Sequence, residues 1–169
     1  MDDTGFKRGP HPILTKKVDA LDELFLSEVD KLSKLATCAR GYCGCVIVNN
    51  GRVISSGYVK SPRNTESCND VGHAMYEHTG SNGVTTQHCG RTIHAEQVAI
   101  CEAASLGHST KGATIYTSLV PCKTCANLIV ECGIKKVIAK NMYQTGADSI
   151  KLFNRNGIEI IVLSMELTY

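Results

Sequence analysis

The chain of 169 residues contains no tryptophan, and aromatic residues make up only 5% of it. Proteins that bind single-stranded nucleic acid usually stack its bases on aromatic side chains, and they carry a strongly basic surface. The formal net charge here is only +2, from 18 basic and 16 acidic residues. Because both features are missing, we expect no nucleic-acid partner.

Long hydrophobic runs and export signals are also missing from the sequence. No apolar stretch approaches the ~20 residues that span a bilayer, and no signal peptide or lipidation motif is present. We therefore expect a cytoplasmic protein with no membrane partner. In a reducing compartment the nine cysteines are expected to be free thiols and metal ligands, not disulfides.

The hydrophobic content of 43% fits one globular enzyme domain. Residues 1–12, rich in glycine, proline and charge, are predicted to form a flexible N-terminal arm, and residues 13–169 the enzyme domain. A helical pattern covers residues 14–39, and a break near Leu26 and Ser27 leaves open whether it is one helix or two. Its apolar residues, among them Leu21 and Leu24, are expected to pack in the core.

Further along the chain, the patterns predict alternating strands and helices. Strands are expected at 43–48, 52–59, 113–117, 136–140 and 158–163, and helices at 92–106, 122–132 and 147–154, whereas 60–90 is predicted as a loop-like insertion. Asn49-Asn50-Gly51 is a strong hairpin turn signal between the first two strands. This order of elements predicts an α/β fold with a mixed sheet flanked by helices.

The most informative pattern is His94-Ala95-Glu96, followed after 24 residues by Pro121-Cys122-Lys123-Thr124-Cys125. His94, Cys122 and Cys125 offer three metal ligands, and a catalytic zinc typically keeps its fourth position for water. Glu96 is near enough in sequence to reach that water and move its proton. Zinc lowers the pKa of a bound water from about 16 to about 7.

The H-x-E and P-C-x-x-C motifs together are the signature of zinc deaminases, so the sequence predicts hydrolytic removal of an amino group. A C-x-x-C motif alone is also typical of redox pairs and zinc ribbons, and H-x-E alone is common by chance. Both ligand sets are expected at helix N-termini, with Pro121 in the first turn of the second helix.

The insertion at 60–90 contains little apolar sequence but many soft metal ligands. Five of them fall within 22 residues: Cys68, His73, His78, His88 and Cys89. Their density indicates a metal site that could replace a hydrophobic core. Free thiols and solvent-exposed histidines are the alternative interpretation.

These motifs resemble the cytidine and deoxycytidylate deaminase superfamily, and within it the deoxycytidylate (dCMP) deaminase-like branch. The resemblance runs from about Leu32 to Val162 and includes the hairpin at 45–54, Ser56-Gly57-Tyr58, and the segment at 133–137. It implies a cytidine deaminase-like three-layer α-β-α sandwich with a central five-stranded mixed sheet. It also implies zinc-dependent hydrolysis of a small pyrimidine nucleotide, dCMP to dUMP and ammonia, by a homo-oligomer.

The resemblance also assigns roles to individual residues. It makes Glu96 the general acid and base, and the contacts to an amino-pyrimidine substrate would come from Ala95, through its backbone amide, with Arg91 and Tyr143. Zn²⁺ ligands for the catalytic ion would be His94, Cys122 and Cys125. A second, structural Zn²⁺ would be held by Cys38, Cys68, His73 and Cys89, with His88 as the rival of His73.

Two positions depart from the pattern of the dCMP branch. Val59 replaces an Asn at the end of the second strand, and Val98 replaces an Asn that often follows the catalytic Glu by two residues. Both Asn side chains lie near the substrate in the family, and Arg63, Asn64 or Arg91 could compensate for them. The substrate is therefore dCMP or another amino-heterocycle, such as a nucleoside, a free base or a pathway intermediate. A non-catalytic nucleotide-binding protein is a further alternative, against which the intact Glu96 counts.

Overall fold

The structure is a computed structural model, and it describes residues 18–79, 83 and 85–167. The arm predicted at 1–12 lies outside these residues. The elements, in chain order, are α1 (Ala20–Ser33), β1 (Gly44–Asn49), β2 (Arg52–Tyr58), α2 (Cys68–Val71), β3 (Met75–Thr79), β4 (Thr85–Cys89), α3 (Ala95–Ser105), β5 (Thr114–Leu119), α4 (Lys123–Glu131), β6 (Lys136–Met142), α5 (Gly146–Arg155) and β7 (Glu159–Leu167).

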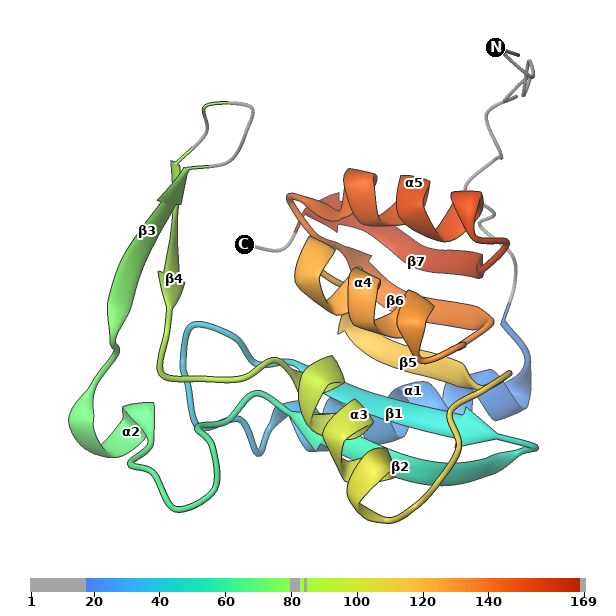
Figure 1. Ribbon diagram of the computed structural model, residues 1–169, viewed down its shortest axis with the longest axis horizontal. Helices are drawn as coiled ribbons and strands as arrows, with labels where there is room; N and C mark the ends of the chain where they lie inside the picture. Colours follow the sequence, from blue (N-terminus) through green and yellow to red (C-terminus); the bar gives the residue numbers. More distant parts are fainter. Residues whose placement is uncertain (1–17, 80–82, 84, 168–169) are drawn as a thin grey trace, which may run out of the picture.

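Five strands form one mixed sheet in the order β2-β1-β5-β6-β7. β1 is antiparallel to both of its neighbours, whereas β5, β6 and β7 are parallel. Parallel neighbours need a crossover connection, which α4 and α5 provide. Helices α3, α4 and α5 cover one face and α1 covers the other (Figure 1), so the α/β prediction of a three-layer sandwich around a five-stranded mixed sheet is confirmed.

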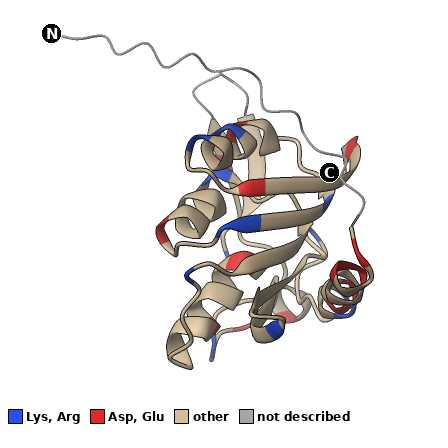
Figure 2. Ribbon diagram, turned by 90° about the vertical axis from the view of Figure 1, so that its right-hand side faces the viewer, with Lys and Arg blue, Asp and Glu red and all other residues tan. Residues whose placement is uncertain are grey.

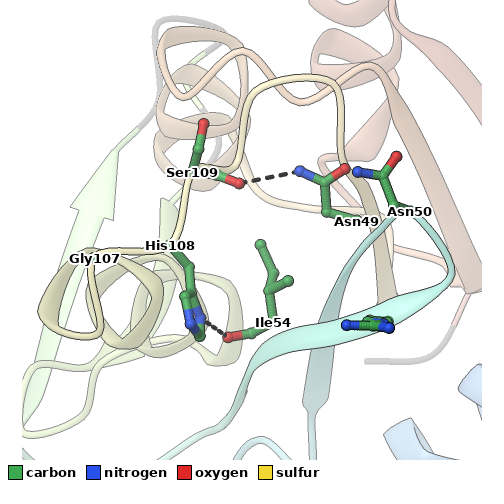
Figure 3. Close-up of a pocket in the computed structure, with 7 residues that line it drawn as sticks. Asn49, Asn50, Ile54, Gly107, His108 and Ser109 are labelled. Atoms are coloured by element: carbon green, nitrogen blue, oxygen red, sulfur yellow. Dashed lines mark hydrogen bonds between the residues drawn. The ribbon is translucent and has the colours of Figure 1, made fainter.

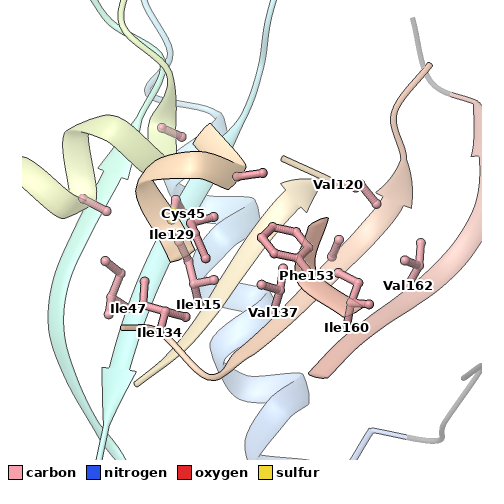
Figure 4. Close-up of a cluster of buried hydrophobic side chains, with 14 of the residues drawn as sticks. Cys45, Ile47, Ile115, Val120, Ile129, Ile134, Val137, Phe153, Ile160 and Val162 are labelled. Atoms are coloured by element: carbon pink, nitrogen blue, oxygen red, sulfur yellow. The ribbon is translucent and has the colours of Figure 1, made fainter. Parts of the chain in front are cut away.

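Alternate side chains of the strands enter two separate cores. In β1, Cys45 and Ile47 belong to the larger core beneath α3, α4 and α5, which also includes Ile129 and Phe153. Figure 4 shows these side chains converging between the sheet and the helices. Val46, the intervening residue, joins the smaller core beneath α1, as the two-residue period of a strand requires.

The N-terminal helical pattern forms one continuous helix, so the second helix considered for it is absent from this described segment. α1 begins with a capping box in which Asp19 and Asp22 cap each other's backbone N–H groups, and it runs without a break through Leu26, which is buried. The expected core packing of the whole pattern is wrong in part. Leu21 and Leu24 are 50% and 54% exposed, because they lie on the face turned away from the sheet.

The insertion is more ordered than its loop-like sequence predicts. It contains the short helix α2 and the antiparallel hairpin of β3 and β4. The hairpin projects away from the main sheet (Figure 1), and every residue of β3 is exposed. Threonines on facing strands and a Tyr76–His88 cross-strand pair favour strand pairing here. The polar composition of the segment does not predict these strands.

Charges of both signs are interspersed over the helices and strands (Figure 2). Some form ion pairs, as between Lys140 of β6 and Asp30 of α1. Within the described ranges, none of the helices combines the length and the apolar character needed to cross a lipid bilayer.

Candidate metal centres

Helices α3 and α4 begin side by side at the same end of the strands, and each begins at a predicted metal ligand. His94 is the N-cap of α3, and Cys122 is the N-cap of α4. Pro121 therefore lies one residue before the cap, not in the first turn as predicted. Cys125 follows three residues after Cys122, on the same side of the helix. Free backbone N–H groups at helix N-termini stabilise negative charge, which suits thiolate ligands.

The three ligand side chains are already arranged for a tetrahedral ion. His94 Nδ1 lies 3.5 Å from Cys122 Sγ and 3.4 Å from Cys125 Sγ. Zinc bound at its usual distances to nitrogen and sulfur, about 2.0–2.1 Å and 2.3 Å, separates them by about 3.6 Å in tetrahedral geometry. The donor set thus fits zinc, and it leaves one coordination position for another ligand.

The electrostatics of this centre move the pKa values of its two thiols apart. The hydrogen bond with Cys122 and then burial raise the pKa of Cys125. Hydrogen bonds from Cys125 and then His94 lower the pKa of Cys122 to about 4, against the effect of burial. The hydrogen bond to Cys122 in turn raises the pKa of His94 to about 9. An imidazolium–thiolate pair results, and a metal ion that binds here displaces the proton between them.

Glu96 lies beside these ligands in the first turn of α3, and its side chain is almost inaccessible, with the residue only 7% exposed. Burial raises the pKa of its carboxyl group, although the nearby His94 acts in the opposite direction. A carboxyl group with a raised pKa holds a proton more readily, which suits a general acid and base.

Gly57 explains how α3 comes so close to the sheet. A Cβ atom at this position would lie 2.3 Å from the carbonyl oxygen of Ala95 and 2.7 Å from the backbone nitrogen of Ala99. Only glycine allows this approach of β2 and the first turn of α3. The Ser-Gly-Tyr sequence thus positions the turn that carries Glu96.

The insertion forms a second cluster, in which Cys38 from the segment after α1 meets three residues of the insertion. The donor atoms of Cys38, Cys68, His73 and Cys89 all lie within 4.8 Å of one another. Cys38 Sγ is 3.5 Å from His73 Nδ1, and Cys68 Sγ is 3.5 Å from Cys89 Sγ. These separations again fit tetrahedral zinc, and four ligands close the coordination sphere.

The pKa values of the two paired thiols in this cluster move apart. Burial raises the pKa of Cys68 to about 12, and its hydrogen bonds to the neighbouring cysteines add to the effect. Burial acts in the same direction on Cys89, but hydrogen bonds, first from the backbone of Arg91 and then from Cys68, lower its pKa to about 6. Backbone donors aimed at a sulfur favour its thiolate form, which is the form that binds metal.

His88, the rival of His73, points elsewhere. Its Nε2 lies 2.8 Å from Thr86 Oγ1, and its ring contacts Tyr76 on the hairpin. Strand alternation explains the difference, because His88 and Cys89 are neighbours in β4 and face opposite sides. The geometry therefore groups His73, and not His88, with the three cysteines.

The predicted substrate contacts are divided between two regions. Ala95 is buried at the start of α3, and Tyr143 is partly buried in the segment after β6. Burial is the main cause that raises the pKa of Tyr143, and the charge of Cys122 adds to it. Arg91 is occupied differently, because its Nε donates a hydrogen bond to the Gly72 carbonyl at 3.1 Å. Arg63 and Asn64 are exposed on the loop after β2.

The two valines that depart from the family pattern are packed against protein. Val59 is 7% exposed and contacts the region of Gly41, and its backbone N–H donates to the Cys43 carbonyl at 3.1 Å. Val98, on α3, packs where β2 passes at Gly57.

A cavity of about 520 Å³ lies at the other end of β1 and α3 (Figure 3). His108 contacts the Ile54 carbonyl there at 2.6 Å, and the Asn49 amide donates to the Ser109 carbonyl at 3.2 Å. None of the residues of the two metal clusters lines this cavity.

Comparisons with known proteins agree with this geometry. A family model described as the cytidine and deoxycytidylate deaminase zinc-binding region matches residues 19–141. ComE operon protein 2 of Bacillus subtilis (strain 168) is 33% identical over 139 residues, which cover 82% of this chain and 69% of the relative. The deoxycytidylate deaminase of Schizosaccharomyces pombe is 30% identical over 141 residues, covering 82% of this chain but only 42% of the yeast protein.

A solved structure shares the fold. The dCMP deaminase of cyanophage S-TIM5, in complex with dCMP and dUMP, superposes with a TM-score of 0.70 at 23% sequence identity. The match covers 87% of this chain and 99% of the phage protein. At this identity the likeness concerns the three-layer architecture.

Proposed function

The chain belongs to the cytidine and deoxycytidylate deaminase family, and we propose that it is a zinc-dependent enzyme that hydrolyses dCMP to dUMP and ammonia. The single observation that carries the proposal is the three-ligand cluster with a buried carboxyl group beside it. A binding protein needs no such group, whereas hydrolysis of an amidine requires proton transfers.

We assign His94, Cys122 and Cys125 as the ligands of the catalytic ion. Bound zinc would lower the pKa of a coordinated water toward neutrality and so supply the nucleophile at pH 7. Glu96 would take one proton from the attacking water and deliver it to the ring nitrogen next to the reacting carbon. It would then take the second proton, from the hydroxyl group newly formed on that carbon, and deliver it to the amino group, which departs as ammonia while the carbonyl group forms. The raised pKa of Glu96 supports both donating steps.

The pyrimidine is held, in this proposal, by groups around the same space. The backbone N–H of Ala95 donates to the ring carbonyl, and Tyr143 borders the ring from the segment after β6. Arg91 is assigned a supporting role, because its hydrogen bond to Gly72 ties the insertion to the segment that leads into α3.

We further propose that Cys38, Cys68, His73 and Cys89 hold a second, structural zinc ion. Support comes from the closed four-donor geometry and from the exposure of the hairpin, which has little apolar core of its own. An isolated two-stranded hairpin is at best marginally stable in water, so a metal at its base would supply the missing stabilisation.

We also propose a homo-oligomer in the cytoplasm. Leu21 and Leu24 lie half exposed on the outer face of α1, where association would bury them. A reducing compartment keeps cysteine ligands available for metal.

Substrate choice is tested by incubating the zinc-loaded protein with a panel of amino-pyrimidine nucleotides, nucleosides and bases. The proposal expects dCMP to be deaminated with the highest kcat/KM. Turnover of a nucleoside or a free base in preference to dCMP would shift the function to the alternative that Val59 and Val98 favour. Absence of any deamination by protein with a full zinc content would contradict the proposed enzyme.

A further inference from the structure

The cavity of about 520 Å³ lies between two connections that are far apart in the sequence, the turn from β1 to β2 and the loop after α3 (Figure 3). Two side chains tie these connections together. The Asn49 amide donates a hydrogen bond to the Ser109 carbonyl at 3.2 Å. His108 Nδ1 lies 2.6 Å from the Ile54 carbonyl, which can only accept, so Nδ1 carries the hydrogen. The walls are thus held by protein contacts, and the volume is within the ~300–1,000 Å³ usual for small-molecule sites.

The lining of this cavity carries an uncompensated positive charge. Arg52 is its only arginine, and it contains no lysine, aspartate or glutamate. Arg52 is exposed, and none of the ion pairs between described residues includes it. No other contact within the described ranges engages its guanidinium group. Because a guanidinium group presents five N–H donors and no acceptor, its complement is an anion with acceptor oxygens.

Two more polar groups of the lining are unengaged within the part of the chain that the structure describes. The side-chain amide of Asn50 has no hydrogen-bond partner there, and neither has Nε2 of His108. Asn50 and Gly51 have φ angles of 51° and 72°, so the chain turns tightly, and Asn49 pairs with Arg52 across the turn. The turn therefore brings Asn50 and Arg52 to the same side of the cavity.

We propose that this cavity is a binding site for a small organic carboxylate, with the Arg52 guanidinium group as the principal contact. The planar guanidinium fork matches the two oxygens of a carboxylate. One arginine without an acidic neighbour in the lining balances a single negative charge. A phosphate group, with a charge of about −1.5 to −2 at pH 7, would lack a second cation. The cavity lies at the opposite ends of β2 and α3 from Gly57 and Glu96, so this ligand is not the pyrimidine substrate.

The test is a titration of the zinc-loaded protein with sodium benzoate at constant ionic strength, followed by nuclear magnetic resonance. We expect saturable shifts of the Arg52 Nε–H and Asn50 side-chain amide signals, with a Kd of about 1 mM or below. Benzamide, which has nearly the same shape but no charge, should bind at least about tenfold more weakly, and so should inorganic phosphate. Arg52→Gln should weaken benzoate binding at least about tenfold. Arg155→Gln is the matched control, because Arg155 is also exposed but lies on α5, outside the cavity.

Benzoate binding of normal strength in Arg52→Gln would overturn the proposal, as would an equal loss in Arg155→Gln. Absence of saturable shifts at Arg52 and Asn50 in the unaltered protein would also overturn it. Equal affinities for benzoate and benzamide would show that the cavity does not recognise charge, and tighter binding of phosphate would assign it to another class of anion. The benzamide and phosphate comparisons use the unaltered protein, so they decide even where Arg52→Gln folds poorly. None of these readouts involves dCMP, so their failure leaves the proposed deaminase activity untouched.

Discussion

The two clusters contain the same kinds of ligand but differ in what supports them. The three-ligand centre lies on the N-termini of α3 and α4, which pack on a five-stranded sheet and a continuous core. The four-ligand cluster lies among a helix of four residues and an exposed hairpin. In the first case the fold positions the ligands, and in the second the ligands would position the segment. An open coordination sphere suits catalysis, and a closed one suits structure.

The largest expected effect is a loss of turnover at the three-ligand centre while zinc binding is unchanged. Glu96→Gln replaces the carboxylate by a nearly isosteric amide that cannot transfer protons. We expect kcat for dCMP to fall by about 10³-fold or more, since each proton transfer is typically worth ~10²- to 10⁴-fold. Elemental analysis should find the zinc content unchanged. A kcat near normal would remove Glu96 from its assigned role.

The second prediction concerns the closed cluster and compares two histidines. His73→Ala removes a ligand and should release one zinc ion per chain, whereas His88→Ala, the matched control, should release none. Loss of the metal leaves the hairpin without support, so limited proteolysis between Cys68 and Cys89 should become roughly tenfold faster. Equal behaviour of the two variants would show that the cluster binds no metal through His73.

Gly57→Ala tests the dependence of the first centre on packing. The added Cβ atom would meet the Ala95 carbonyl at 2.3 Å, so β2 and α3 must separate. We expect the free energy of unfolding to fall by about 1–3 kcal/mol, together with a lower kcat. Gly51→Ala, in an open turn, is a control that should leave kcat unchanged. Unchanged stability and kcat in Gly57→Ala would show that this close approach does not position Glu96.

The smallest expected effect concerns substrate choice. Val59→Asn restores the amide usual in the dCMP branch, and one additional hydrogen bond is worth about 0.5–1.5 kcal/mol. We therefore expect kcat/KM for dCMP to rise about 3- to 10-fold, measured beside Val59→Leu as an apolar control. A fall or no change would indicate that the buried surroundings of Val59 give the amide no partner in the substrate.

Much of the fold and both clusters could be predicted from the sequence. The periodic apolar residues of the sheet and of α3 and α4 predict their elements closely, because those elements are amphipathic or buried. The hairpin of β3 and β4 is not predicted from the sequence, because cross-strand pairs such as Tyr76 with His88 produce no alternation of apolar and polar residues along the chain. The choice of His73 over His88 likewise depends on strand alternation, which a segment predicted as a loop does not supply.

Close contacts between segments that are distant in the chain also cannot be predicted from the sequence. The sequence shows Gly57 as part of a motif, but only the structure shows why glycine is required: a Cβ atom there would collide with the Ala95 carbonyl. The prediction that Leu21 and Leu24 of α1 pack in the core is wrong, because an apolar helical pattern does not show which leucines face the sheet.

The zinc stoichiometry of purified protein tests the contrast between the two clusters most directly. We predict about two zinc ions per chain in the unaltered protein and about one in each of Cys68→Ser and Cys122→Ser. Only the Cys122→Ser protein should lose deamination entirely, whereas Cys68→Ser should retain activity while its insertion becomes sensitive to protease. One zinc ion per chain in the unaltered protein, with no change in Cys68→Ser, would contradict the account.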